Sequence, residues 1–172
     1  MSEKNVGIVL RSPTIHKSTL TLFDKSVGKI EALNSPGEVL SSGSLVSYGL
    51  KKGRVRYFLQ DVALLDMPFG LARVNVMFLH HILELCDYFV PWEGKNEELF
   101  TLMEVIYKNH EMIATPQGQK LFLNSFFKYV GEYSEEVANK KGWAAFIARH
   151  PQLLSLRTAS FLKVLEGYEE PA

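Results

Sequence analysis

Five short stretches rich in β-branched and aromatic residues occupy the first 66 residues of the chain. Turn-forming residues such as Gly28, Pro36, Gly37 and Gly53 separate them. The pattern predicts five strands, at residues 6–11, 18–24, 28–33, 44–50 and 54–65. Because a closed barrel removes the exposed edges of an open sheet, we expect a small OB-type barrel, with an SH3-like barrel as the alternative.

The last of these strands lies in the phrase LKKGRVRYFLQD, residues 50–61, which combines four basic residues with apolar and aromatic ones. Side chains alternate between the two faces of a strand, so one face is expected to carry Val55, Tyr57 and Leu59. The other face would then carry Arg54, Arg56, Phe58 and Gln60.

The hydrophobic period changes after residue 67. Apolar residues now recur every three or four positions, at Leu71, Val74, Phe78, Ile82, Leu85 and Phe89. This spacing predicts a helix over about residues 71–90 that ends before Pro91. Asn96 is a candidate N-cap of a second helix, and Thr115 followed by Pro116 is typical of the start of a third.

Three shorter helices complete the prediction. Ser134 to Glu136 could cap one, and residues 142–150 and 158–166 would form the others. The fold class is therefore α+β, with an OB-type barrel domain at residues 1–67 and an all-helical bundle domain at residues 68–172.

Charge divides the chain at the same place, although the formal net charge is zero. Residues 1–66 hold nine Lys/Arg against six Asp/Glu, and residues 67–172 hold ten against thirteen, which gives +3 and −3. Such an asymmetry can mark the first part as a nucleic-acid face, and a chance distribution of charge is the alternative interpretation. With no secretion signal and no run of eighteen apolar residues, we expect a cytoplasmic protein with no membrane partner.

No catalytic motif is present: the sequence lacks G-x-S-x-G, a P-loop, G-x-G-x-x-G and H-E-x-x-H. His80 and His81 are adjacent, which turns their imidazoles about 100° apart on a helix and favours a surface or packing role. Glu84 and Asp87 are interpreted as part of a polar helix face. The single cysteine, Cys86, is expected to be a buried thiol. We therefore predict a non-enzymatic protein without a metal or cofactor.

Binding is the remaining chemistry. Single-stranded nucleic acid is held by a positive groove together with stacking on aromatic or guanidinium groups. Arg54, Arg56 and Phe58 could supply both, with Lys51 and Lys52 at the preceding turn contacting phosphates. An ordinary solvated strand face is the alternative interpretation of the same residues.

The phrase GIVLRSPTIHKSTLTLFDKSVGKIEAL, residues 7–33, resembles the start of the RecO family of bacterial recombination mediators. It has a short strand, a polar turn, a strand ending in Leu-Phe, and a Gly-Lys-Ile turn. The resemblance continues through the helical phrase LARVNVMFLHHILELCDYFVPWEGKNEELFTLMEVI, residues 71–106, and covers about the first 107 residues.

This resemblance implies an OB-fold followed by a helical domain. It also implies a role in DNA repair and recombination: binding single- and double-stranded DNA, annealing strands, and helping to load the recombinase. A RecR-like protein and the single-strand-binding protein would be the partners, near the nucleoid. Arg11, Lys29, Arg54 and Arg56 are the candidate DNA contacts on the barrel, and Arg11 and Lys29 match recurring family letters. Lys17, in the polar turn, joins the candidates.

The chain departs from the family in three ways. The segment NSPGEVLSSGS, residues 34–44, contains no cation where the family usually carries a basic loop. The four zinc-binding cysteines of many members are absent, and the chain is shorter than typical members. A protein–protein interaction module of the same architecture that has lost DNA binding is therefore the alternative function.

Overall fold

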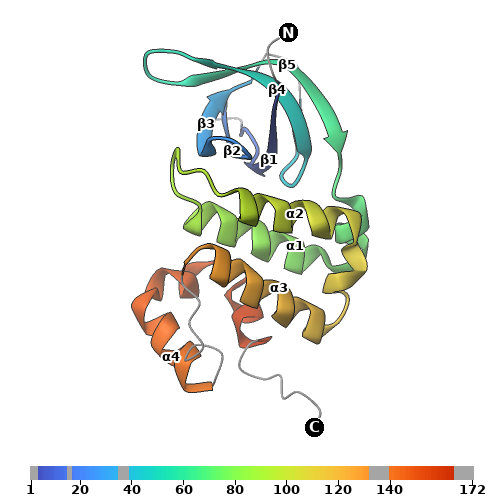
Figure 1. Ribbon diagram of the computed structural model, residues 1–172, viewed down its shortest axis with the longest axis vertical. Helices are drawn as coiled ribbons and strands as arrows, with labels where there is room; N and C mark the ends of the chain where they lie inside the picture. Colours follow the sequence, from blue (N-terminus) through green and yellow to red (C-terminus); the bar gives the residue numbers. More distant parts are fainter. Residues whose placement is uncertain (1–3, 15–16, 35–38, 132–139, 165–172) are drawn as a thin grey trace. The chain divides into compact units, whose positions relative to one another are not determined.

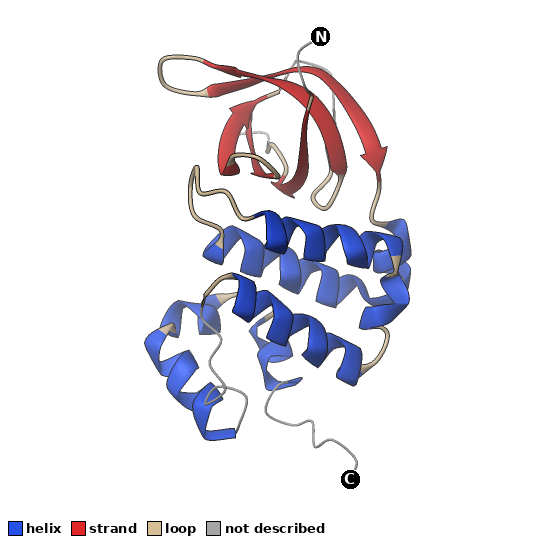
Figure 2. Cartoon of the chain, viewed as in Figure 1, coloured by secondary structure: helices blue, strands red, loops and turns tan. Residues whose placement is uncertain are grey.

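The structure is a computed structural model that describes residues 4–14, 17–34, 39–131 and 140–164. Its five strands are β1 (Asn5–Arg11), β2 (Thr19–Asp24), β3 (Gly28–Leu33), β4 (Leu45–Lys52) and β5 (Tyr57–Asp66). They form a closed barrel in the order β1-β2-β3-β5-β4, in which β4 pairs with β1 (Figures 1 and 2). All neighbours are antiparallel except β3 and β5. The predicted five-stranded barrel is confirmed, and its order is consistent with the OB type.

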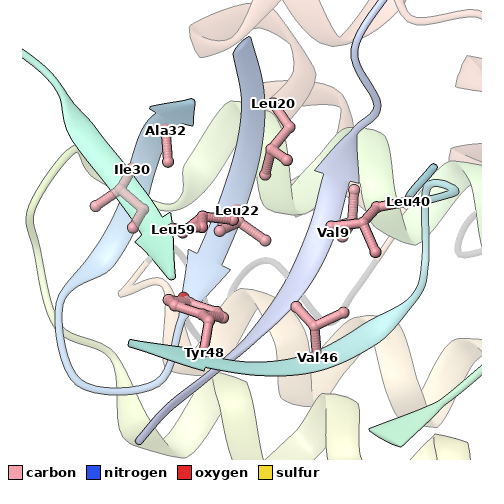
Figure 3. Packing of buried hydrophobic residues seen from close by; sticks show 9 residues of the cluster. All are labelled: Val9, Leu20, Leu22, Ile30, Ala32, Leu40, Val46, Tyr48 and Leu59. Carbon is pink, nitrogen blue, oxygen red and sulfur yellow. The ribbon is translucent and has the colours of Figure 1, made fainter. Parts of the chain in front are cut away.

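Every strand contributes an inward-facing side chain to the barrel core (Figure 3). The buried cluster consists of Val9, Leu20, Leu22, Ile30, Ala32, Leu40, Val46, Tyr48 and Leu59. Leu40 comes from the segment before β4 and the other eight come from the strands. Because each fully buried Val, Leu or Ile stabilises a fold by roughly 1.5–3 kcal/mol, the alternating pattern that predicted the strands also fixes their register.

A buried carboxylate ties three strands together at one end of the barrel. Asp24 is fully buried, and its Oδ2 accepts hydrogen bonds from the Tyr48 hydroxyl at 2.5 Å and the Asn5 amide at 3.0 Å. Its Oδ1 accepts from the backbone N–H groups of Ser26 and Val27 at 2.7 and 2.8 Å. Burial, together with the neighbouring carboxylate, raises the pKa of the Tyr48 hydroxyl. Four donors therefore compensate for the burial of the Asp24 charge.

Among the described residues, four α-helices follow the barrel: α1 (Phe69–Phe89), α2 (Glu97–Lys108), α3 (Pro116–Tyr129) and α4 (Lys140–Arg149). Three 3₁₀ helices accompany them, η1 (His110–Ile113), η2 (Pro151–Ser155) and η3 (Ala159–Leu162). The predicted caps are confirmed: Asn96 Oδ1 accepts from the Leu99 N–H at 3.0 Å and Thr115 Oγ1 from the Gly118 N–H at 3.1 Å. The predicted start at Ser134 to Glu136 lies outside the described residues. In the described part of the predicted last helix, the short η3 is followed directly by α-helical residues 163–164.

The first helix is interrupted at Asn75, whereas the sequence pattern had predicted a continuous helix. Asn75 has non-helical backbone angles, φ −160° and ψ 89°, and its side chain accepts a hydrogen bond from the Phe78 N–H at 2.9 Å. Asn75 therefore caps the longer second part of α1. The apolar spacing continued through this position, so it could not reveal that a short amide side chain had replaced one turn of backbone hydrogen bonding.

By length and composition alone, α1 could cross a membrane, with a mean hydropathy of 1.2 in its most apolar window. Of that window, 44% is buried inside the structure. Core helices of water-soluble proteins have the same length and hydropathy. These two properties of α1 are therefore not evidence that it crosses a membrane.

The chain divides into two compact units, and the boundary between them falls within α1. One consists of Met1–Phe69 with Leu85–Phe100, and the other of Gly70–Glu84 with Thr101–Ala172. The first unit thus adds the end of α1 and the start of α2 to the barrel. In it, Phe23 of β2 packs edge-on against Phe100 at 5.2 Å, and Cys86 is buried as expected. A domain boundary at residue 67 stays a prediction.

The described part of the second unit contains packed aromatic rings and a hydrogen-bonded chain of His81, Thr158 and Glu84. Phe78 packs edge-on against Phe122 and Phe161, with ring centroids 6.1 and 5.5 Å apart. His80 is exposed, whereas His81 is fully buried, with its Nδ1 3.0 Å from Thr158 Oγ1. The Thr158 hydroxyl donates its hydrogen to Glu84 at 2.5 Å, so His81 Nδ1 is the donor of the other bond. Burial lowers the pKa of His81 to about 4, although Glu84 opposes the shift.

Acid is expected to destabilise the second unit through His81. Its folded pKa of about 4 lies below the ordinary value of 6.5, so the unfolded chain binds the extra proton between these values. The free energy of unfolding should be constant above about pH 6.5 and fall by up to about 3 kcal/mol towards pH 4. Urea unfolding across this range, followed by circular dichroism, measures it.

The neighbouring histidine supplies the matched control. His81→Gln should flatten the pH dependence, whereas His80→Gln, at an exposed position, should leave it unchanged. Equal pH dependence in both variants would show that His81 does not carry the effect.

Candidate nucleic-acid interface

The loop after α1 pairs with the half of β3 that β5 leaves open. β5 pairs with β3 only at Ala32 and Leu33. At the other end of the strand, the Lys29 N–H donates to the Pro91 carbonyl at 3.2 Å, and the Lys29 carbonyl accepts from the Glu93 N–H at 2.9 Å. The segment at residues 91–94, here called the docking loop, therefore extends the sheet beside β3.

Glycine is required where the docking loop meets the strand. Gly28 has φ +95°, in the left-handed region, and a Cβ at this position would lie 2.1 Å from the Gly94 carbonyl oxygen. A larger residue could be accommodated only if the loop moved away. The Gly-Lys-Ile turn that carried the family resemblance thus has a steric role in this chain.

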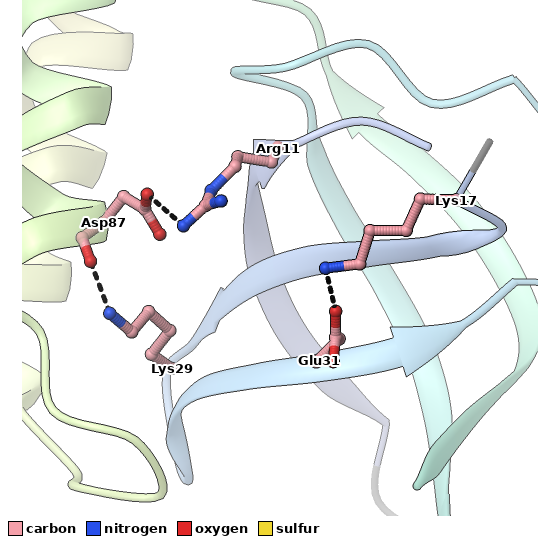
Figure 4. Close-up of polar contacts among 5 residues, drawn as sticks. All are labelled: Arg11, Lys17, Lys29, Glu31 and Asp87. Carbon is pink, nitrogen blue, oxygen red and sulfur yellow. Dashed lines mark hydrogen bonds and ion pairs between the residues drawn. The ribbon is translucent and has the colours of Figure 1, made fainter. Parts of the chain in front are cut away.

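The Lys29 side chain points towards the backbone of Asp87 at the end of α1 (Figure 4). Its ammonium donates to the Asp87 carbonyl oxygen and lies 4.5 Å from the centroid of the Trp92 ring. Lys29 is 5% exposed, and burial lowers its pKa, partly offset by the Asp87 carboxylate. Its structural role is to hold Trp92 in place. A DNA contact of this residue stays a prediction.

Two further candidate contacts are exposed but paired with carboxylates (Figure 4). Arg11, at the end of β1, lies 2.6 Å from the Asp87 carboxylate. Lys17 forms an ion pair with Glu31 of β3. Exposed pairs of this kind are worth about 0–1 kcal/mol, so a phosphate could compete for either cation.

The remaining candidates lie on the hairpin formed by β4 and β5. Lys51 and Lys52 are the last residues of β4 and are exposed, where the sequence had suggested a turn. Lys52 lies 3.5 Å from Glu93 Oε1 and 5.2 Å from the centroid of the Tyr57 ring. Lys51 has no ion pair within the described residues.

The prediction that Arg54, Arg56 and Phe58 share a strand face is wrong. β5 begins at Tyr57, and the two arginines lie in a turn that a Gly53 N–H to Arg56 carbonyl bond of 2.8 Å closes. Beyond Gly53 the chain reverses and finds no partner strand, so alternation does not apply there. Phe58 lies on β5 with 43% of its surface exposed, and its ring lies against Gly53.

The turn also leaves Val55 89% exposed, whereas the sequence had placed it on a strand face with Tyr57 and Leu59. Of the three residues expected on this face, Tyr57 is partly buried and Leu59 is fully buried. The hairpin tip therefore presents both arginines and an apolar side chain to solvent.

A groove of about 310 Å³ runs between β3, the hairpin and the docking loop. It is lined by Lys29, Ile30, Glu31, Val55, Arg56, Tyr57, Trp92 and Glu93. Trp92 is 56% exposed, and the Tyr57 hydroxyl donates to Glu93 Oε1 at 2.8 Å. The groove thus combines two aromatic rings with an equal number of cations and carboxylates.

Both carboxylates of the groove are held in the ionised form. Hydrogen bonds from Lys17 and from Thr19 lower the pKa of Glu31. The hydrogen bond from Tyr57, together with the Lys52 charge, lowers the pKa of Glu93. The groove keeps fixed negative charges beside its aromatic rings at neutral pH.

Sequence reasoning missed Trp92 and the contribution of Tyr57. The available signal was the position of Trp92, which lies between Pro91 and Glu93 beyond the end of a predicted helix. A large aromatic residue in such a polar turn is often exposed for binding. Nothing in the local pattern indicates that this turn lies beside β3.

Comparison with models of known protein families gives no match for this sequence, and a search of curated proteins finds no relative. The resemblance to the RecO family therefore stays a prediction. Within the described part of the chain, no group of three or more His, Cys, Asp or Glu side chains could hold a metal ion.

Substituting Gly28→Ala is expected to release the docking loop. The added Cβ would overlap the Gly94 carbonyl at 2.1 Å, so we expect a loss of about 1–3 kcal/mol in the free energy of unfolding. In a Trp143→Phe background, the emission of Trp92 should shift to the red as the ring leaves Lys29.

Gly49→Ala is the matched control, because its nearest neighbour would lie 3.5 Å away in ordinary contact. Similar emission spectra for Gly28→Ala and the parent would mean that the loop does not need this close approach.

Proposed function

We propose that this chain is a non-enzymatic DNA-binding protein whose groove and basic hairpin hold single-stranded DNA. The observation that carries the proposal is the juxtaposition of Trp92 and Tyr57 with the hairpin cations. Residues 51–60 include four Lys or Arg and no Asp or Glu. Sequence-independent binding of a single strand requires two interactions: stacking of bases on aromatic rings, and contacts between cationic side chains and phosphates.

The hairpin cations differ in how much protein they already contact. Lys51, Arg54 and Arg56 are exposed and have no ion pair within the described residues. Arg54 and Arg56 flank the apolar tip, so the guanidinium groups can reach a strand that enters the groove. We assign the main phosphate contacts to these three residues, with Lys52, Arg11 and Lys17 as weaker ones.

The wider role that we propose is that of a recombination mediator similar to the RecO family. Such a protein binds single- and double-stranded DNA, anneals complementary strands and assists recombinase loading, with a RecR-like protein and the single-strand-binding protein as partners. The support is the resemblance of residues 7–33 and 71–106, together with an OB-type barrel followed by helices. The site of action would be the cytoplasm, at the nucleoid.

One observation favours the alternative function, a protein-interaction module without DNA binding. Arg11, Lys17, Lys29 and Lys52 each contact a carboxylate or carbonyl of the same unit. The groove lining has no net charge, with Lys29 and Arg56 balanced by Glu31 and Glu93. Fewer cations are therefore available to phosphates than the sequence suggests.

Binding of a labelled single-stranded oligonucleotide, measured by fluorescence anisotropy over a salt series, tests the proposal. We expect affinity to fall steeply with salt, and Arg54→Glu/Arg56→Glu to weaken binding about tenfold or more at low salt. Loss of two phosphate contacts should also reduce the slope of log K against log salt by about 1–2.

Arg73→Glu/Lys163→Glu is the matched control, since it makes the same charge change at two exposed positions of the other unit. It should keep most of the binding. Absence of salt-dependent binding in the parent protein would reject the DNA-binding proposal and favour the interaction module.

A further inference from the structure

We propose that the groove holds one unpaired nucleobase and selects bases that carry an exocyclic amino group. The inference rests on the proposed function, because it assumes that single-stranded DNA reaches the groove. It assigns a specificity role to Glu31 and Glu93, the two carboxylates of the groove lining.

The groove has the size and the platform for a base. Its volume of about 310 Å³ is at the small end of the range for ligand sites, roughly 300–1,000 Å³. Trp92 is 56% exposed while Lys29 lies 4.5 Å from its ring centroid. An indole held in this way can stack on a base without first losing side-chain entropy.

The polar lining favours a base over a phosphate. Lys17 and Thr19 both contact Glu31 through Oε1, and Lys52 and Tyr57 both contact Glu93 through Oε1. The Oε2 atom of each carboxylate has no hydrogen bond within the described residues. Two ionised oxygens that still accept hydrogen bonds repel a phosphate and attract N–H donors.

The cations of the hairpin, of which Arg56 also lines the groove, act in the opposite sense. Lys51, Arg54 and Arg56 on the hairpin attract the sugar–phosphate backbone, so a strand would place its phosphates along the hairpin and turn a base inward. The same cations, with Lys29 and Lys52, oppose the entry of a positively charged side chain from a protein partner. A nucleobase, which is neutral and carries donors, fits both constraints.

Base edges differ in the donors they offer to a carboxylate. Cytosine, adenine and guanine each carry an exocyclic amino group, whereas thymine carries a carbonyl oxygen at the position of the cytosine amino group and a methyl group on the adjacent ring carbon. A carboxylate accepts from the cytosine amino group and repels the thymine carbonyl. We therefore expect cytosine to bind about tenfold more tightly than thymine at this position.

Anisotropy titrations of oligo(dC) and oligo(dT) of equal length, at one salt concentration, test the inference on the full chain. The parent protein should bind oligo(dC) about tenfold more tightly. Glu93→Gln and Glu31→Gln should each move the affinity ratio towards one, because a neutral amide can accept from cytosine or donate to thymine.

Glu97→Gln is the matched control, since Glu97 lies in the same unit, outside the groove, and pairs with Lys95 at 2.9 Å. It should preserve the parent's ratio. Equal binding of both oligonucleotides by the parent would overturn the base selectivity while leaving DNA binding intact.

Selectivity that survives both groove variants would also overturn the inference, because the carboxylates would not be its source. Failure to bind either oligonucleotide would instead reject the proposed function itself. A short arginine-rich peptide, titrated in parallel, tests whether the groove binds a protein partner instead of DNA. Peptide binding that Glu93→Gln abolishes, without oligonucleotide binding, would assign the groove to a protein partner.

Discussion

The arrangement of the barrel unit depends on the pairing of the docking loop with the open half of β3. β5 covers β3 only at its last two residues, so the backbone groups of Lys29 would otherwise face solvent or an unpaired edge. The two hydrogen bonds to residues 91 and 93 satisfy them. Gly28 makes the close approach possible, since its missing Cβ leaves space for Gly94.

This pairing determines what the surface can bind. It places Trp92 over the Lys29 ammonium and Glu93 beside Tyr57 and Lys52. The groove exists because the hairpin and the docking loop lie beside different parts of the same edge of β3. The Lys29 ammonium, which the family resemblance presents as a DNA contact, lies against the Trp92 ring. In the function that we propose, the groups around it make the main contacts with DNA.

Much of the fold could be predicted from the sequence because its signals are local. Strand alternation, the caps at Asn96 and Thr115, and the turn glycines depend on residues within a few positions of one another. The kink at Asn75 and the turn at Arg54 to Arg56 were missed, although they are also local. In each case a periodic pattern of side chains continued through a position where the backbone changed direction.

The candidate site was less predictable, since it is assembled from distant segments. The bond from Lys29 to the Asp87 carbonyl joins residues 58 positions apart, and no periodicity connects the end of a helix to a barrel strand. Composition identified the hairpin cations correctly as exposed but could not show which were already paired. Glu31 and Glu93 gave no sequence signal, because an isolated glutamate is most often a solvated surface residue.

The most direct test of the account is the response of the Trp92 indole N–H to single-stranded DNA, followed by two-dimensional NMR of the nitrogen-15-labelled protein. Trp92→Phe assigns the signal. The account predicts that the indole signal and the amides of residues 51–58 shift together as the oligonucleotide is added. An oligonucleotide that binds while these signals stay fixed would contradict it, and the groove would not be the DNA site.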